Sequence, residues 1–544
     1  MTVGDGSDAM SGDDVASVSP DWLNRAKVFW LFVAGLTCFR LLYISVAPLT
    51  PQEAYYWYYS QKLDLSYFDH PPVTAYSIWM GTRLFGDTIF GIKVMGVLWS
   101  ALTNAVLYWV SLNVAARDRV GSSHHSPRRT AFLVVIVYNM TLFAHVYAVT
   151  FTPDTPLLLC WLLVIGLWLE AMERDRARWW VLAGAALGLG LASKYTAIAL
   201  VPAIVTVPVV ESQYRHHLRK PGPYLAVLAA VLVFMPVICW NATHEWASFA
   251  FQFQNRVRRA QSLRVDYLGQ LLVSQLVLLT PLVFGLIVAM AKQVVNRWRD
   301  HPTCRVLFLT GAFIVVGFIA VSLTSLVKMN WLLPGYTGFI MAAALMHERT
   351  ILAWGRWVKI GVCVSVLLIV IGHGLWVVPN VPLGEANTWS GWAEAAARVA
   401  VLQRERGGRE KCFVFSNSYK GASLLKFYLP EHQDVYAENI YGRPALQFDF
   451  WPVPASLIGD DALYVISDRK EYKAELDKVS AYFDEVVLLE AFDTRFVDGI
   501  TTRRISCYLA RNYKGSRRAP APVIRGALDG LCGPISSAHA PRLG

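Results

Sequence analysis

Long apolar runs separated by short polar segments dominate the first 380 residues of the chain. Most runs are long enough to cross about 30 Å of hydrocarbon as a helix. They lie at residues 28–48, 94–115, 131–149, 155–171, 179–192, 196–210, 222–240, 268–291, 306–326, 331–346 and 357–378. This pattern predicts an α-helical polytopic membrane protein with about eleven transmembrane helices.

The pattern changes beyond residue 380, where charged residues return and short alternating runs replace the long ones. Strands are predicted at residues 411–418, 434–439, 462–468, 484–492 and 503–511, with a helix at 422–429. A small C-terminal α/β domain outside the membrane follows. The predicted organisation is a disordered cytoplasmic tail (1–24), a transmembrane domain (25–380) with an outer loop (49–90), the external domain (381–515) and a disordered tail (516–544).

Composition and charge support this assignment. The chain is 55% hydrophobic and 16% charged, with a mean hydropathy of +0.38, which excludes a water-soluble globular protein. The net charge of +11 does not indicate nucleic-acid binding, because most basic residues lie in alternate loops between the predicted helices. Such an asymmetry predicts a multi-pass inner-membrane protein with a cytoplasmic N-terminus and a periplasmic C-terminal domain. The polar, acidic first twenty residues are unlike a cleavable signal peptide.

The eight cysteines have no CxxC motif and no metal-ligand spacing. We therefore expect neither a metal site nor a cofactor. Cys412 and Cys507 both fall in strand-like runs of the external domain. A disulfide between them is one prediction for an oxidising compartment.

The first outer loop is rich in tyrosine and carries Glu53, Asp69 and His70. Thr50 and Pro51 begin a helix there, with Glu53 at its third position. One interpretation is that Glu53 closes a capping box and that the tyrosines form an interfacial belt. The other is that the carboxylate takes part in catalysis.

A second helix start resembles the first, because Thr152 and Pro153 precede Asp154. A carboxylate in the first turn of a helix is favoured as the anion. Glu53 and Asp154 at one membrane face could flank an acceptor hydroxyl, one acting as general base and the other orienting it. Two independent helix caps are the alternative.

Basic residues are predicted at the same face. Lys194 lies in a very short link between apolar runs, Lys328 lies in a tight turn, and one outer loop carries Arg256, Arg258, Arg259 and Arg264. Together they could hold a lipid phosphate and stabilise the charge of a leaving phosphate. Interfacial anchoring is the alternative for each lysine, and headgroup contacts for most of the arginines.

Several motifs in order along residues 25–350 resemble those of GT-C glycosyltransferases of the aminoarabinose- and galacturonosyl-transferase type, relatives of the protein O-mannosyltransferases. The motifs are LTPQEAYYW (49–57), YFDHPP (67–72), TPDTP (152–156), LASKYTA (191–197), WNATHEWASFAFQ (240–252) and VKMNW (327–331). The resemblance implies a polyprenyl-phosphate-linked sugar donor, an acceptor on lipid A, another envelope glycan or a protein, and transfer with inversion above the membrane surface.

Two positions depart from the family pattern. The family usually has an Asp, favoured as a catalytic acid or base, where this chain has Gln52, so the role would pass to Glu53, Asp69 or Asp154. Alternatively, an anionic acceptor would need no base. A lysine that contacts lipid phosphate in the aminoarabinose enzymes is replaced by His70.

The resulting prediction is an inverting glycosyltransferase that moves a monosaccharide from a polyprenyl-phosphate donor to lipid A, lipopolysaccharide or another envelope glycan, or alternatively to a protein. Membrane lipids are expected partners and nucleic acid is not. Glu53 and Asp154 form the predicted catalytic pair, with Asp69 in support. The predicted substrate-binding residues are Lys194, Lys328, His70, Arg256, Arg258, Arg259, Tyr55, Tyr67 and Tyr336.

Two other classes of function compete with this prediction. A lipid-linked sugar transporter would need polar groups along a path through the bilayer. A non-catalytic subunit that binds lipid-linked sugar would explain Gln52. The aromatic segment at 441–451 of the external domain is expected to pack against the transmembrane domain, or else to contact the acceptor.

Overall fold

The computed structural model describes residues 21–117, 126–257, 263–296, 298, 302–378, 387–467, 475–495 and 501–515, with the backbone alone for 253–257. The chain forms two compact units. The first unit, called here the membrane unit, comprises Met1–Ser66, His70–Ile238 and Gln254–Val381. The second, the sheet unit, comprises Tyr67–Asp69, Cys239–Phe253 and Pro382–Gly544. The predicted tail at 516–544 and most of the tail at 1–24 lie outside the described residues.

Helices make up the membrane unit, as the apolar runs predict. They are α1 (Ala26–Ile44), α2 (Pro51–Gln61), α3 (Val73–Phe85), α4 (Ile89–Arg117), α5 (Pro127–Asn139), α6 (Leu142–Val149), α7 (Asp154–Arg174), α8 (Ala177–Ser193), α9 (Val201–Val210), α10 (Pro221–Thr243), α12 (Val265–Asn296), α13 (Pro302–Ser322), α14 (Leu333–Met346), α15 (Glu348–Leu352) and α16 (Arg356–Val377). The 3-10 helices η1 (Asp21–Asn24), η2 (Tyr195–Leu200) and η3 (Ser212–Arg219) connect them. Helix α10 runs on into the sheet unit.

Seven of the described helices are long and apolar enough to cross a membrane, and up to nine spans result if each of two bent pairs counts as one. The protein is thus a multi-pass membrane protein, whereas the predicted count of eleven is not confirmed. Helices α8 and α14 account for the difference, because they are shorter than the helices that pass this test.

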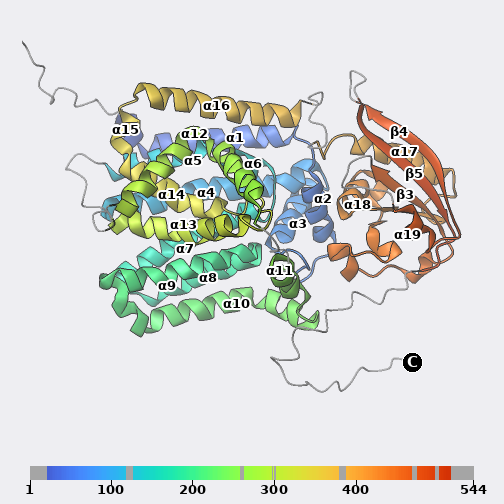
Figure 1. Ribbon diagram of the computed structural model, residues 1–544, viewed down its shortest axis with the longest axis horizontal. Coiled ribbons are helices and arrows are strands. Elements are labelled where there is room, and N and C mark those ends of the chain that lie inside the picture. The colour runs from blue at the N-terminus through green and yellow to red at the C-terminus, as the bar shows by residue number, and fades with distance from the viewer. Residues whose placement is uncertain are drawn as a thin grey trace, which may run out of the picture. The chain divides into compact units, whose positions relative to one another are not determined.

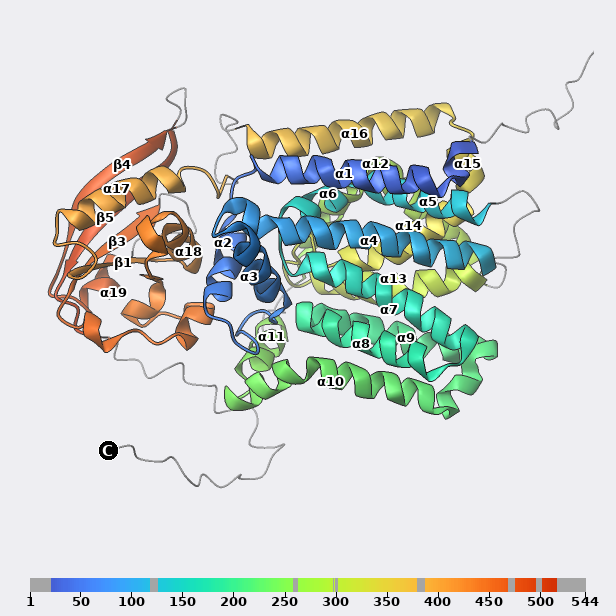
Figure 2. The ribbon, with the colours of Figure 1, turned by 180° about the vertical axis from the view of Figure 1, so that it is seen from behind.

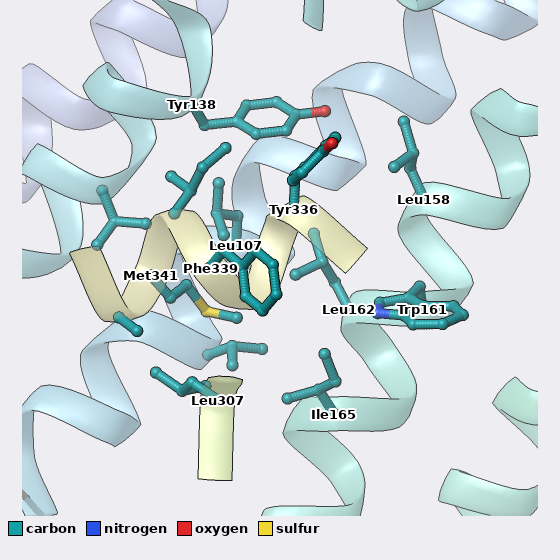
Figure 3. Close-up of a cluster of buried hydrophobic side chains, with 14 of the residues drawn as sticks. Leu107, Tyr138, Leu158, Trp161, Leu162, Ile165, Leu307, Tyr336, Phe339 and Met341 are labelled. Carbon is teal, nitrogen blue, oxygen red and sulfur yellow. The ribbon is translucent and has the colours of Figure 1, made fainter. Parts of the chain in front are cut away.

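The long helices of the membrane unit lie side by side, with α2 and α3 at one end and α15 at the other (Figures 1 and 2). Apolar side chains from α4, α5, α7, α13 and α14 fill the space between them. Figure 3 shows part of this cluster, in which Tyr336 lies close to Leu107, Tyr138 and Phe339.

A sharp break of 73° separates α5 from α6 and leaves backbone groups without helical partners. The guanidinium of Arg40, which is 1% exposed, donates to Ser100 Oγ, Asn139 Oδ1 and the Ala144 carbonyl. The ring of His145 contacts the Asn139 carbonyl at 3.0 Å. These polar contacts hold the break, which sends the chain from α6 toward the start of α7.

Three arginines that the sequence assigns to basic loops form buried or half-buried ion pairs at the end of the membrane unit opposite α2. The pairs are Arg117–Glu170, Arg129–Glu348 and Arg305–Glu211. Their carboxylates are only 2–8% exposed, so these charges contribute to packing as well as to topology. The orientation of the termini stays a prediction.

A five-stranded sheet forms the centre of the sheet unit, in the order β2-β1-β3-β5-β4. Its strands are β1 (Cys412–Ser416), β2 (Val435–Tyr436), β3 (Asp461–Ser467), β4 (Glu485–Arg495) and β5 (Thr501–Arg511). Each predicted strand is found; β1 is parallel to β2 and β3, and β5 is antiparallel to its neighbours β3 and β4.

Further helices and 3-10 helices belong to the sheet unit, α11 only as far as Phe253. They are α11 (Ala247–Val257), α17 (Trp392–Arg404), α18 (Tyr419–Tyr428), α19 (Leu476–Ser480), η5 (Pro430–His432), η6 (Glu438–Tyr441), η7 (Leu446–Phe450) and η8 (Ala455–Leu457). The aromatic face of the sheet, with Phe415 stacked between Tyr464 and Phe483, packs against η6 and α19. The prediction of a small α/β domain is confirmed, although α17 was not foreseen.

The disulfide that the sequence left open between Cys412 and Cys507 is not formed, since both thiols are free. Strand β3 lies between their strands, and Cys412 pairs with Asp461 whereas Cys507 pairs with Val465. Two strand spacings and a four-residue offset place the Cα atoms roughly 16 Å apart. A disulfide requires no more than about 7 Å.

Candidate active site

Glu53 lies in the first turn of α2, at the end of the membrane unit where α2 and α3 are found. The Thr50 side chain accepts from the Glu53 N–H, and the Glu53 carboxylate accepts from the Thr50 N–H at 3.0 Å. The capping box predicted from the sequence is confirmed. The same carboxylate also reaches beyond its own helix, to Lys93 Nζ at 2.6 Å and to the Phe151 N–H at 2.8 Å.

Glu53 and Lys93 are both completely buried. Each carboxylate oxygen of Glu53 already accepts at least two hydrogen bonds, which is about the capacity of a carboxylate oxygen. A general base must present a free lone pair to its substrate. The geometry therefore favours a structural role for Glu53, joining α2, α4 and the segment before α7.

Asp154 begins α7 and meets two polar side chains from distant parts of the chain. Its Oδ1 accepts from Lys194 Nζ at 2.7 Å, and its Oδ2 accepts from Asn330 Nδ2 at 2.8 Å. Asp154 is 3% exposed and Lys194 7% exposed. Lys194 follows α8 directly and Asn330 lies between α13 and α14, so three helix ends meet at this cluster.

The two ion pairs are neighbours along the chain, because Phe151 contacts Glu53 and Asp154 comes three residues later. The predicted likeness of the two helix starts does not extend to capping. Helix α7 has no side-chain cap, and Thr152 Oγ1 is buried without a hydrogen-bond partner among the described residues. The carboxylate of Asp154 is thus oriented by Lys194 and Asn330 instead of by its own helix turn.

The remaining predicted residues of the membrane unit differ in burial and in their surroundings. His70 is half-buried and packs edge-on against Tyr56, with ring centroids 5.5 Å apart, and Tyr55 is 2% exposed beside Tyr59. Lys328 is exposed and lies two residues before Asn330. Tyr336 packs in the apolar core of Figure 3, which favours a structural role.

Asp69 and Tyr67 belong to the sheet unit, not to the membrane unit. Tyr67 is completely buried and Asp69 is 7% exposed. The Asp69 carbonyl accepts from Gln252 Nε2 at 2.9 Å, so a segment of the first outer loop is held by α11. The structure does not bring Asp69 together with Glu53 or Asp154 within one unit.

Of the four arginines in the predicted basic outer loop, the structure describes the side chain of Arg264 alone. Arg258 and Arg259 lie outside the described residues, as does the side chain of Arg256. Arg264 is described, and its guanidinium pairs with Asp266 at 2.8 Å on the surface. Their predicted phosphate contacts stay a prediction.

Two residues of the site were missed by the sequence reasoning. Lys93 lies just before the predicted span at 94–115, yet α4 begins at Ile89 and includes it. An ionisable residue inside a long apolar helix is an indicator of function or of a buried partner. Asn330 stands within the quoted VKMNW motif but carried no assigned role. Among the described residues, no group of three or more His, Cys, Asp or Glu side chains could hold a metal ion.

Comparison with known proteins gives the site its context. Residues 69–240 match the family described as dolichyl-phosphate-mannose-protein mannosyltransferase. The lipid A galacturonosyltransferase RgtD of Rhizobium johnstonii is 22% identical over 79% of this chain and 89% of its own length. The undecaprenyl phosphate-alpha-4-amino-4-deoxy-L-arabinose arabinosyl transferase of Erwinia tasmaniensis is 30% identical, over 38% of this chain and 36% of its own length.

The solved structure of ArnT from Cupriavidus metallidurans bound to undecaprenyl phosphate has a TM-score of 0.60 with this chain. It is 15% identical, and the match covers 89% of this chain and 98% of that one. At this identity the match shows the fold. The chain covers most of RgtD but only about a third of the Erwinia enzyme. The chain thus has the fold of this ArnT structure, and its sequence is similar to membrane glycosyltransferases of the lipid A-modifying type.

Proposed function

We propose that this enzyme transfers a monosaccharide from a polyprenyl-phosphate donor to an envelope glycan acceptor, with lipid A as the leading candidate, at the periplasmic face of the inner membrane. The observation that carries the proposal is the buried cluster of Asp154, Lys194 and Asn330 where three helix ends meet. A cation and a carboxylate in contact supply the two groups that such a transfer requires. The names of RgtD and of the arabinosyl transferases support the classes of donor and acceptor.

Lys194 is the proposed ligand of the donor phosphate. An ammonium has three N–H donors, so Lys194 can keep its bond to Asp154 and still donate to phosphate oxygens. The leaving group is a lipid phosphate, which departs as an anion without a general acid. Stabilisation of its charge by a buried cation is then the larger contribution to the rate. His70 and Lys328 are proposed to assist at the donor headgroup.

Asp154 is the proposed acceptor-side residue. Among the described residues, Lys194 donates to one of its oxygens and Asn330 to the other, and a carboxylate offers about four lone-pair sites, so it can still accept from a sugar hydroxyl. It would act as general base for a hydroxyl acceptor attacking the anomeric carbon from the face opposite the phosphate. A phosphate or carboxylate acceptor is already a nucleophile, and Asp154 would then serve to hold Lys194 in place.

A protein acceptor is the second candidate. The match of residues 69–240 to a protein mannosyltransferase family favours it. Mass spectrometry of lipid A, other envelope glycans and envelope proteins, from cells with and without the gene, separates the two. A sugar mass that disappears from one of these fractions identifies both the sugar and the acceptor class.

The catalytic assignment is tested with purified protein in lipid nanodiscs, undecaprenyl-phosphate-linked aminoarabinose or galacturonic acid, and lipid A. Asp154→Asn and Lys194→Met are each expected to lower kcat about 100-fold or more. Asp175→Asn and Lys220→Met are matched controls, because this exposed ion pair lies outside the cluster. Full transfer by both cluster variants would overturn the assignment, and absence of transfer by the wild type with any donor would overturn the function.

A further inference from the structure

The sheet unit includes three residues of the first outer loop, Tyr67–Asp69. These residues lie more than 300 positions before the sheet in the sequence. They immediately precede His70, which the proposed function places at the donor headgroup. What holds this short segment therefore bears on the reaction.

Two glutamine side chains bind the peptide groups at the two ends of the segment, Tyr67–Phe68 and Asp69–His70. Gln447 Oε1, from η7, accepts from the Phe68 N–H at 2.6 Å. Gln252 Nε2, from α11, donates to the Asp69 carbonyl at 2.9 Å. Gln447 is 2% exposed, so its bond to Phe68 is shielded from water. Hydrogen bonds to the peptides before Phe68 and after Asp69 fix the backbone direction of this segment, and hence where His70 begins.

Aromatic rings hold the same segment from two sides. The Phe68 ring stacks on Phe450 with centroids 4.9 Å apart and contacts Phe251 at 4.7 Å. Phe450 in turn contacts Trp240 at 5.7 Å. The aromatic segment at 441–451 thus packs on the first outer loop and on residues 239–253. The sequence predicts that this segment packs on the transmembrane domain at 25–380, which includes the outer loop at 49–90, and the contacts with Phe68 agree with that expectation.

The turn that presents Gln447 is itself fixed. Asn439 Nδ2 donates to the Phe448 carbonyl at 2.8 Å, and Asp449 accepts from the Ala445 N–H at 2.9 Å. Asn439 follows β2 by three residues. A rigid connection therefore runs from the sheet through η6 and η7 to the peptide of Phe68.

We propose that Gln447 is a positioning residue for the transfer reaction, which sets the backbone of Tyr67–Asp69 and through it the placement of Asp69 and His70. The inference rests on the proposed function and assigns the sheet unit a part in it. In this proposal Gln447 acts through the backbone of the segment and not through contact with the substrate. Its removal would leave the N–H of the half-buried Phe68 without this acceptor, and the segment would shift to reach another one.

The test compares Gln447→Leu, Gln447→Glu and Gln403→Leu in the full-length protein. Leucine removes the acceptor, whereas glutamate keeps a carboxylate oxygen that can accept from Phe68. Gln403 is the matched control, because it is 5% exposed in the same unit and bonds a backbone carbonyl of β1. We expect kcat/KM for the donor to fall tenfold to a hundredfold in Gln447→Leu, to recover to within threefold of wild type in Gln447→Glu, and to be unchanged in Gln403→Leu.

A double-mutant cycle with His70→Asn separates positioning from general destabilisation. If Gln447 acts through the segment that leads to His70, the loss caused by Gln447→Leu is at least threefold smaller in the His70→Asn background. Equal losses in both backgrounds, or an equal loss in Gln403→Leu, would overturn the inference. If Gln447→Leu does not fold, Gln252→Leu removes the second hydrogen bond and must show the same dependence on His70. No transfer by the wild type refutes the proposed function, whereas transfer that Gln447→Leu leaves intact refutes this inference alone.

Discussion

The buried pair of Glu53 and Lys93 allows a sharp test of whether Glu53 is structural or catalytic. Both side chains are 0% exposed and their closest atoms are 2.6 Å apart. Glu53→Gln removes the negative charge and leaves the Lys93 ammonium buried without it. The glutamine nitrogen also cannot accept the hydrogen bonds that one carboxylate oxygen now receives.

Removal of one partner from a buried ion pair destabilises a protein by about 3–5 kcal/mol. The pair joins α2 to α4, and Phe151 joins both to the start of α7, so the whole end of the membrane unit depends on it. We expect the Tm of Glu53→Gln in detergent to fall by on the order of 10 °C. Transfer activity should fall with it, because the segment that leads to Asp154 loses an anchor.

The double variant Glu53→Gln, Lys93→Met distinguishes the two roles. It removes the unpaired charge, so at least about 2 kcal/mol of the lost stability should return. Thermal unfolding followed by tryptophan fluorescence and transfer kinetics are measured on the same preparations. For a structural Glu53, both stability and transfer recover in the double variant.

Two results would refute this reasoning. An unchanged Tm in Glu53→Gln would mean that the ion pair does not stabilise the protein. A double variant that regains stability while transfer stays about 1,000-fold below wild type would show that the carboxylate itself takes part in the reaction.

Two further predictions concern stability. Helices α13 and α14 cross closely at Gly311, where an added Cβ would lie 2.2 Å from the Gly335 carbonyl oxygen. Gly311→Ala should therefore lower the Tm. Gly317→Ala should not, because the space around Gly317 is open. In the sheet unit, burial raises the pKa of Glu438 from 4.5 to about 7. The folded state therefore binds this proton more tightly than the unfolded state does, and the free energy of unfolding falls as the pH rises from about 4.5 through 7. Glu438→Gln should therefore raise the free energy of unfolding by at most about 3 kcal/mol at pH 8 and leave it unchanged at pH 4. Glu410→Gln, at an exposed position, is the control and should not show this difference between the two pH values. Equal melting curves of Glu438→Gln and wild type at pH 8 would contradict the assignment.

Much of the fold is determined locally. The apolar runs are long enough to require helices, because backbone polar groups in hydrocarbon must be satisfied within the segment. The strands of the sheet unit follow from alternating apolar residues, and the capping box of α2 follows from Thr50, Pro51 and Glu53 within one turn. These features depend on residues near one another in the chain.

The partners of the buried charges depend on tertiary structure. Lys93 is 40 residues from Glu53, and Asn330 is 176 residues from Asp154. The hydrophobic effect depends on the apolar area that is buried and not on the direction of the contact. The hydrophobic pattern of the sequence therefore does not determine which helix ends come into contact. A hydrogen bond, in contrast, requires a definite distance and angle, which only the packed helices provide.

The same reason explains the predictions that the structure changed. Cys412 and Cys507 both lie in strands, but the intervening β3 and the strand register keep them apart. Tyr67–Asp69 read as part of an outer loop, yet Gln447 and Phe450 bind them into the sheet unit. The sequence alone determined which segments are helices and strands and which residues carry chemistry, because these follow from local pattern. Only the tertiary structure decided which charges neutralise one another and which remain available to a substrate, because that depends on contacts between segments far apart in the chain.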